Sequence, residues 1–125
     1  SNILGGTVVS HTDTTVTIES AELGGSLQAP GNQRGELNWM VRPERMRLAT
    51  APESGWNAIQ GTLTEVIFTG GVTRSLVTTA GGATLMVAGL TFEQGLDNQP
   101  GQQVWVLWHP SDTVLLPTTS KREAA

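Results

Sequence analysis

Apolar and polar residues alternate in short runs along most of the chain, and Gly-rich breaks separate the runs. Between residues 14 and 20, Val16 and Ile18 fall on one parity, while Thr15, Thr17 and Glu19 fall on the other. Alternation with a period of two is typical of a half-buried β-strand. Helix signals are almost absent, so the pattern predicts an all-β domain. The expected strands cover residues 7–10, 14–20, 26–29, 36–41, 61–69, 73–79, 83–89 and 103–108.

One strand pattern breaks and resumes one residue out of step. Trp39 and Val41 share one parity, and after Arg42-Pro43-Glu44 the apolar positions resume at Met46 on the other parity. The residue before a proline is pushed to extended geometry, and proline suits the first central position of a turn. One added residue moves the next side chains to the opposite face. The sequence therefore predicts a corner at Arg42-Pro43-Glu44.

Residues 73–79 and 83–89 are expected to pair as a hairpin around Gly81-Gly82. Glycine tolerates positive φ at both central positions of a primed two-residue turn. That register places Leu76 opposite Val87.

The stretch from Val104 to Trp108 contains five consecutive apolar residues. Successive side chains of a strand point to opposite faces, and a small barrel has one interior. One set, Trp105 and Leu107, is therefore predicted to lie outside the barrel as an intersubunit contact. The alternative is that the chain's own segment 50–60 or its C-terminal tail covers this face.

The second half of the chain repeats the order of the first. This predicts two pseudo-repeated strand units, 1–49 and 60–117, joined by a connector at 50–59 and followed by a polar tail at 118–125. The matching pairs are Gly6-Thr7-Val8 with Gly61-Thr62-Leu63, Gly24-Gly25 with Gly81-Gly82, Pro30-Gly31 with Pro100-Gly101, and LNWMVRPERMRL with VWVLWHPSDTVL.

Composition excludes several classes of function. The 125 residues suit one domain, and the absence of cysteine excludes disulfides and thiolate metal sites. The single lysine, Lys121, lies outside any phosphate-binding loop pattern. His11 and His109 have no neighbours at metal-ligand spacing. We therefore expect no metal site, no cofactor and no catalytic residue.

Two charged sets remain as candidate ligand sites. Arginine forks suit oxyanions, but a solvated strand face neutralised by Glu36 and Glu44 is the preferred interpretation of the clustered arginines. Carboxylates beside aromatic faces suit polyamine cations, although tryptophans more often serve as core and interface anchors. The arginines are Arg34, Arg42, Arg45 and Arg47; the carboxylates are Glu44, Glu53, Glu65, Glu93, Asp97 and Asp112; the tryptophans are Trp39, Trp56, Trp105 and Trp108.

In this order, the motifs resemble the C-terminal TOBE region of ATP-binding subunits of bacterial ABC importers. The branch that they resemble most serves the polyamines putrescine and spermidine. In that family an Arg-Pro-Glu follows a strand, and a Gly-x-Val-like strand, a Phe-x-Gly step and a Pro-x-Asp turn come later. The matching residues here are Arg42, Pro43, Glu44, Gly61, Phe68, Gly70, Pro110 and Asp112.

The resemblance implies an OB-like small β-barrel over residues 1–117, with a regulatory and dimerising role. ATP would bind only the ATPase domain, which is absent from this chain. The implied partners are a second copy of the subunit and the membrane subunits of a transporter. The implied location is cytoplasmic, with the parent subunit peripheral on the inner face of the membrane. No nucleic-acid partner is expected, because the net charge is −4 and single strands need a basic groove. The alternative is a small-ligand or oxyanion-binding barrel from another importer branch, serving sulfate, iron, molybdate or sugar.

Overall fold

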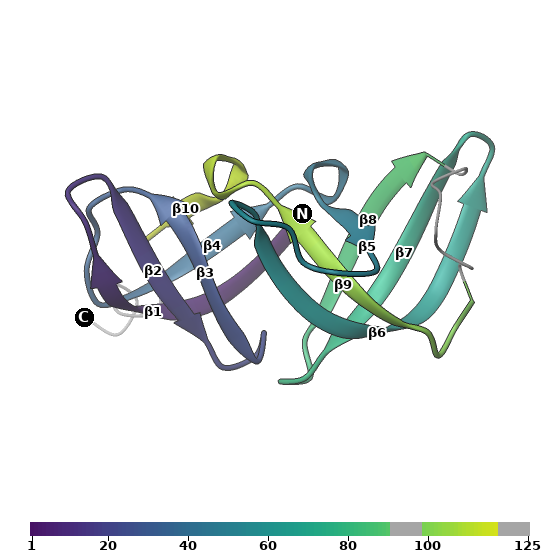
Figure 1. The fold of residues 1–125 in the computed structure, drawn as a ribbon, viewed down its shortest axis with the longest axis horizontal. Helices are drawn as coiled ribbons and strands as arrows, with labels where there is room; N and C mark the ends of the chain where they lie inside the picture. Colours follow the sequence, from purple (N-terminus) through teal and green to yellow (C-terminus); the bar gives the residue numbers. More distant parts are fainter. Residues whose placement is uncertain (91–98, 118–125) are drawn as a thin grey trace.

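A computed structural model of the chain describes residues 1–90 and 99–117 (Figure 1). None of the helices in these residues is long and apolar enough to cross a membrane. This part of the chain forms ten strands and two single-turn 3-10 helices, η1 and η2. In chain order they are β1 (Asn2–His11), β2 (Thr15–Ser20), β3 (Gly25–Pro30), β4 (Glu36–Val41), η1 (Pro43–Arg45), β5 (Arg47–Ala49), β6 (Asn57–Thr69), β7 (Val72–Thr79), β8 (Thr84–Leu90), β9 (Gln103–Trp108), η2 (Pro110–Asp112) and β10 (Val114–Leu116).

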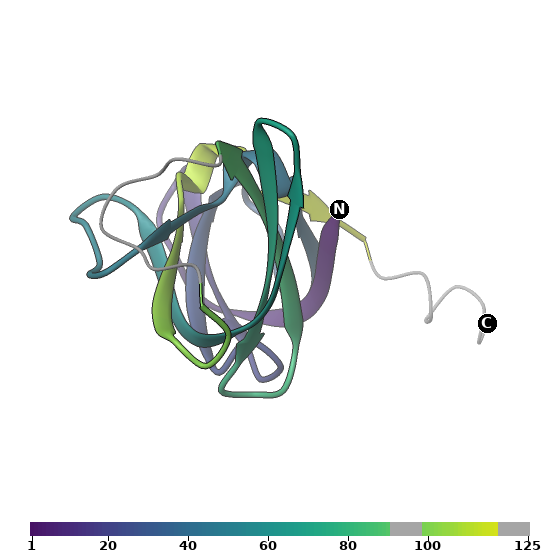
Figure 2. The same ribbon diagram turned by 90° about the vertical axis from the view of Figure 1, so that its right-hand side faces the viewer.

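The strands form two five-stranded sheets, and one edge strand of each sheet comes from the other half of the sequence. The first sheet has the order β10-β4-β1-β2-β3, and the second has the order β5-β9-β6-β7-β8. The sheets lie side by side in Figure 1, and the view along the long axis in Figure 2 shows the strands curling around a common interior. The all-β, OB-like prediction is confirmed.

The two sheets are built in the same way, strand for strand. Each begins with a strand that carries a bulge, between Val8 and Ser10 in β1 and between Leu63 and Glu65 in β6. β1 lies between β2 and β4, as β6 lies between β7 and β9. Asn2 pairs with Val41 at the end of β4, and Asn57 pairs with Trp108 at the end of β9. The pseudo-repeat is therefore present, although Pro30-Gly31 ends β3 while Pro100-Gly101 precedes β9, so that sequence match has no structural counterpart.

The corner at Arg42-Pro43-Glu44 transfers the chain from one sheet to the other. Arg42 is extended, with φ −72° and ψ 142°, as a residue before proline must be. η1 then completes one turn, and β5 pairs with β9 in the second sheet. η2 does the same between β9 and β10 in the opposite direction, after an extended His109. The change of parity between Val41 and Met46 therefore marks a change of sheet.

The predicted register of the β7–β8 hairpin is wrong by one residue. Leu76 pairs with Met86, and Thr78 pairs with Thr84, so the loop is longer than the two glycines. Of the two glycines only Gly82 has positive φ, at 93°. Gly81 instead lies against the carbonyl oxygens of Ala21 and Glu22, where a Cβ atom would clash.

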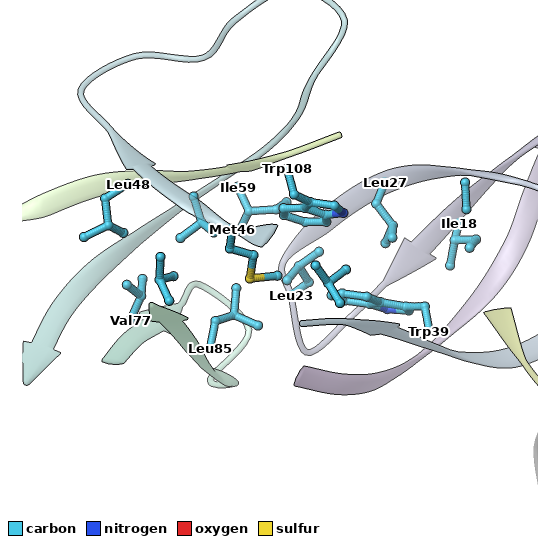
Figure 3. Close-up of a cluster of buried hydrophobic side chains, with 14 of the residues drawn as sticks. Ile18, Leu23, Leu27, Trp39, Met46, Leu48, Ile59, Val77, Leu85 and Trp108 are labelled. Atoms are coloured by element: carbon cyan, nitrogen blue, oxygen red, sulfur yellow. The ribbon is translucent and has the colours of Figure 1, made fainter. Parts of the chain in front are cut away.

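One hydrophobic core runs through both sheets. Ile18 and Leu27 of the first sheet belong to the same buried cluster as Val77 and Leu85 of the second (Figure 3). At the junction, the rings of Trp39 and Trp108 stack with centroids 5.8 Å apart and planes 7° from parallel. Both side chains are fully buried. A shared core of this kind makes the two sheets a single folding unit.

Two asparagines join the sheets with related hydrogen bonds. Asn57 Nδ2 donates to the carbonyl oxygen of Gln28 at 2.9 Å, and the Gln28 amide donates to Asn57 Oδ1 at 2.8 Å. At the equivalent place, Asn2 Nδ2 donates to the carbonyl oxygen of Met86 at 2.9 Å, and the Met86 amide donates to Asn2 Oδ1 at 2.8 Å. Each asparagine side chain thus completes the backbone pairing of a strand in the other unit, β3 or β8.

Replacing Asn57 with alanine is expected to lower the free energy of unfolding by about 1–3 kcal/mol, because the Gln28 amide and carbonyl lose their partner in a partly buried place. Urea denaturation measures this loss. Gln60→Ala, on the exposed side of the same strand, is the matched control and is expected to leave the midpoint unchanged. An unchanged midpoint for Asn57→Ala would mean that water replaces the side-chain amide at no net loss.

Pro43→Ala and Pro110→Ala are each expected to lower the free energy of unfolding by about 0.4–1 kcal/mol, because the unfolded chain gains freedom that proline removes. Denaturant melts of both variants test the equivalence of the two corners. Glu44→Ala, at an exposed position of η1, is the control and is expected to have no effect. Wild-type midpoints for both proline variants would contradict a structural role for the corners.

Candidate functional site

The corner residues that the family pattern selects lie at the junction between the sheets (Figure 1). Pro43 is half-buried, while Arg42 and Glu44 are exposed. In η1, the amides of Arg45 and Met46 donate to the carbonyl oxygens of Arg42 and Pro43 at 3.0 and 3.2 Å. This backbone bonding accounts for the motif without any ligand.

The second corner repeats this geometry with Pro110 and Asp112. The amide of Asp112 donates to the carbonyl oxygen of His109 at 2.9 Å, and the amide of Thr113 donates to that of Pro110 at 3.0 Å. The Thr113 hydroxyl also accepts the indole N–H of Trp108 at 2.9 Å. The corner therefore also positions one ring of the tryptophan stack.

The three remaining motif residues lie on the β6–β7 hairpin. Gly61 is buried where a Cβ atom would lie 2.8 Å from the Thr78 carbonyl oxygen, so the close approach of β6 to β7 requires glycine there. Gly70 has φ of 66° in the tight turn at the tip. Phe68 is exposed at the same tip with Ile67 and Val72, so the tip presents an apolar surface.

The two predicted interface residues, Trp105 and Leu107, share the outer face of the second sheet but differ in how far they are buried. Leu107 is fully buried within the single chain, while Trp105 is half-buried. β9 therefore has apolar side chains buried on both faces, as expected. Leu107 has no surface left for a partner, because its own chain covers it, and only Trp105 remains available.

The connection between β5 and β6, residues 50–56, runs on the outer side of β9 and is named the crossing segment (Figures 1 and 2). Arg47, on β5, forms an ion pair with Glu53 at 2.9 Å and lies 4.8 Å from the centre of the Trp56 ring. Trp56 in turn stacks on His109, with centroids 3.7 Å apart. Charge, cation–π and stacking contacts thus hold the crossing segment on the sheet.

The clustered arginines do not assemble into one anion site. Arg34 precedes β4 and Arg42 follows it, so a six-residue strand of roughly 20 Å separates them. The Arg34 guanidinium donates to the carbonyl oxygens of Asn32 and Gln33, and Arg47 is neutralised by Glu53. A partly solvated structural role fits these contacts.

Among residues 1–90 and 99–117, the carboxylates and tryptophans suggested for a polyamine cage are not gathered in one place. Trp39 and Trp108 are fully buried in the core and have no exposed ring face. Glu53 is bound to Arg47, while Glu44 and Glu65 are exposed on separate elements. Two of the proposed carboxylates, Glu93 and Asp97, lie outside the described residues. Within residues 1–90 and 99–117, no three acidic or imidazole side chains come close enough to hold a metal ion.

An acidic hollow that the sequence reasoning missed lies on the outer face of the first sheet. It has a volume of about 530 Å³ and lies over β1, between β2 and β4. Glu19 and Glu36 both lie in register with Thr7, one on each neighbouring strand, and Glu22 follows from the β2–β3 turn. Their outward parity was readable from the sequence, but their convergence depends on strand pairing. Carboxylates around an open hollow attract cations without forming a coordination site.

Comparison with known proteins agrees with this architecture. A family model described as the TOBE domain matches residues 39–116. The spermidine/putrescine import ATP-binding protein PotA of Thermobifida fusca (strain YX) is 32% identical over 128 residues, which cover 94% of this chain and 32% of that protein. The chain therefore spans about a third of the length of this relative.

A solved structure has the same fold over nearly its full length. It is the cytoplasmic molybdate-binding protein ModG with molybdate bound, which superposes with a TM-score of 0.81 over 94% of this chain and 96% of that chain. At 20% sequence identity this likeness concerns the fold alone. The family match across β4 to β10 establishes that the chain belongs to the TOBE domain family.

Proposed function

We propose that this chain is the regulatory and dimerising domain of the ATP-binding subunit of a bacterial ABC importer for polyamines. The observation that carries the proposal is the 32% identity to a spermidine/putrescine import ATP-binding protein along 94% of the chain. The order of the motifs at Arg42, Gly61, Phe68 and Pro110 supports the same branch. In this proposal the ATPase domain is a separate part of the parent subunit, and the domain formed by these residues performs no catalysis.

In the proposed mechanism the domain acts through contacts between protein subunits. The two sheets share a single core and exchange strands, so the domain acts as one rigid body. A rigid body attached to each ATPase subunit can hold two subunits at a fixed spacing and so bias their closure around ATP. Self-association through a two-fold axis would bury the same surface on both copies.

The proposed setting follows from this role. The parent subunit would contact the membrane subunits of the transporter from the cytoplasmic face. The domain brings no membrane-spanning helix within its described residues.

A second candidate function is a free-standing oxyanion binder. The fold it shares with a cytoplasmic molybdate-binding protein, over nearly all of both chains, favours this function. The contacts of two arginines argue against an oxyanion site, because Arg34 donates to a backbone carbonyl oxygen and Arg47 forms an ion pair with Glu53. Arg42 and Arg45, the other two members of the cluster, are exposed on the corner.

Thermal-shift measurements with molybdate, sulfate, spermidine, putrescine and Mg-ATP separate the two functions. We expect neither molybdate nor sulfate to raise the melting temperature, whereas an oxyanion binder would gain about 2.7 kcal/mol at a ligand concentration 100 times its Kd. Mg-ATP is expected to have no effect, because the chain contains no phosphate-binding loop. Stabilisation by molybdate would replace the proposed function with the second one.

The sequence encoded just upstream of Ser1 tests the assignment to an ATP-binding subunit. A Gly-x-x-x-x-Gly-Lys-Ser/Thr loop there, and ATP hydrolysis by the longer protein, are expected. An upstream region without that loop would refute the assignment while leaving the family of the domain unchanged.

Light scattering on the isolated chain tests dimerisation. We expect a dimer that Trp105→Glu converts to a monomer, because a charge would replace the half-exposed ring at the contact. Ser26→Glu, at an exposed position of β3 in the other sheet, is the matched control and is expected to remain dimeric. A wild-type monomer at high concentration would end the idea that Trp105 mediates self-association.

A further inference from the structure

The outer face of the first sheet carries an uncovered apolar row. Ile3 on β1, Met40 on β4 and Val114 on β10 lie directly opposite one another across three neighbouring strands. Ile3 is 53% exposed and Val114 is 46% exposed, with Met40 half-buried between them. Three apolar side chains in register on an open sheet face form a surface suited to a further contact.

The same row exists on the second sheet, where it is covered. The equivalents of Ile3, Met40 and Val114 are Ala58, Leu107 and Arg47, which pair in the same register across β6, β9 and β5. Leu107 is fully buried, unlike Met40. On this sheet the crossing segment lies outside β9 and is bound to Arg47 through Glu53 and Trp56.

The equivalence of the sheets indicates what would cover the first row. The crossing segment ends at Trp56 and leads directly into Asn57, whose side chain joins the two units. Asn2 makes the equivalent hydrogen bonds to Met86, so the position that corresponds to Trp56 is Ser1. The counterpart of the end of the crossing segment, the part that leads into Asn57, is therefore the stretch of chain that leads into Ser1.

We propose that the segment immediately upstream of Ser1 in the parent subunit packs across β4 and covers the row formed by Ile3, Met40 and Val114. The proposal rests on the proposed function, in which this chain is one part of a longer subunit, and the matched relative is about three times as long as the aligned region. Val114 occupies the position that Arg47 occupies on the second sheet. The upstream segment would therefore make an apolar contact at the place where the crossing segment makes an ion pair. The segment would fix the preceding domain against this sheet through side chains of aliphatic or aromatic character.

Cysteine labelling tests this proposal directly, because the chain has no cysteine of its own. Val114→Cys is prepared in the chain of residues 1–125 and in the full subunit, and the rate of reaction with a thiol reagent is measured in both. We expect a rate about tenfold or more lower in the full subunit, because a covered thiol reacts only through local opening. Val9→Cys, on the same β1 strand as Ile3 and 55% exposed, is the matched control and is expected to react equally fast in both proteins.

Each other outcome overturns the proposal. Equal rates for Val114→Cys in both proteins would show that the upstream segment does not cover the row. Protection that increases with protein concentration would assign the row to a second copy. A gene that encodes nothing upstream of Ser1 would also overturn it. Ile3→Cys provides the same readout if Val114→Cys fails to fold. ATP hydrolysis by the full subunit is measured separately, so covering of the row and the proposed function can fail independently.

Discussion

The exchange of one short strand in each direction is the constraint on which the rest of the structure depends. β5 leaves the first half of the sequence to pair with β9, and β10 returns from the second half to pair with β4. Neither sheet is complete without the other half. The proline corners, the stacked Trp39 and Trp108, and the asparagine bonds all lie where the two exchanged paths meet. They stabilise the crossing, and the crossing in turn makes one core from two sheets.

The exchange of strands also explains why several polar side chains have a structural role. Asn2 and Asn57 are buried amides that satisfy backbone groups of the opposite unit, where an unpaired donor or acceptor would destabilise the fold. Arg47 and Glu53 serve the crossing segment in a similar way. Such joints suit the dimerising role proposed above, because a rigid domain moves as a whole when one surface is engaged.

Local sequence rules predicted the features that local chemistry decides. The corner at Arg42-Pro43 follows from proline geometry, and the double-sided β9 strand follows from parity alone. The features that the sequence did not predict depend on contacts between residues far apart in the chain. The β7–β8 register was missed because Gly81 lies against carbonyl groups of Ala21 and Glu22 in the other unit. The acidic hollow was missed because its glutamates come from elements that only strand pairing brings together.

The crossed strands have a consequence for how the chain can be divided. A cut within residues 50–56 would not give two independent sheets, because each piece would still hold an edge strand of the other. The two pieces would remain interlocked, with the tryptophan stack and both asparagine bonds intact. By the same logic, a polypeptide of half this length could build the whole body as a two-fold pair of identical chains, each lending its last strand to its partner. The covalent link between the two halves thus ensures that each half exchanges its strand with the other half of the same chain. The fold itself does not depend on that link.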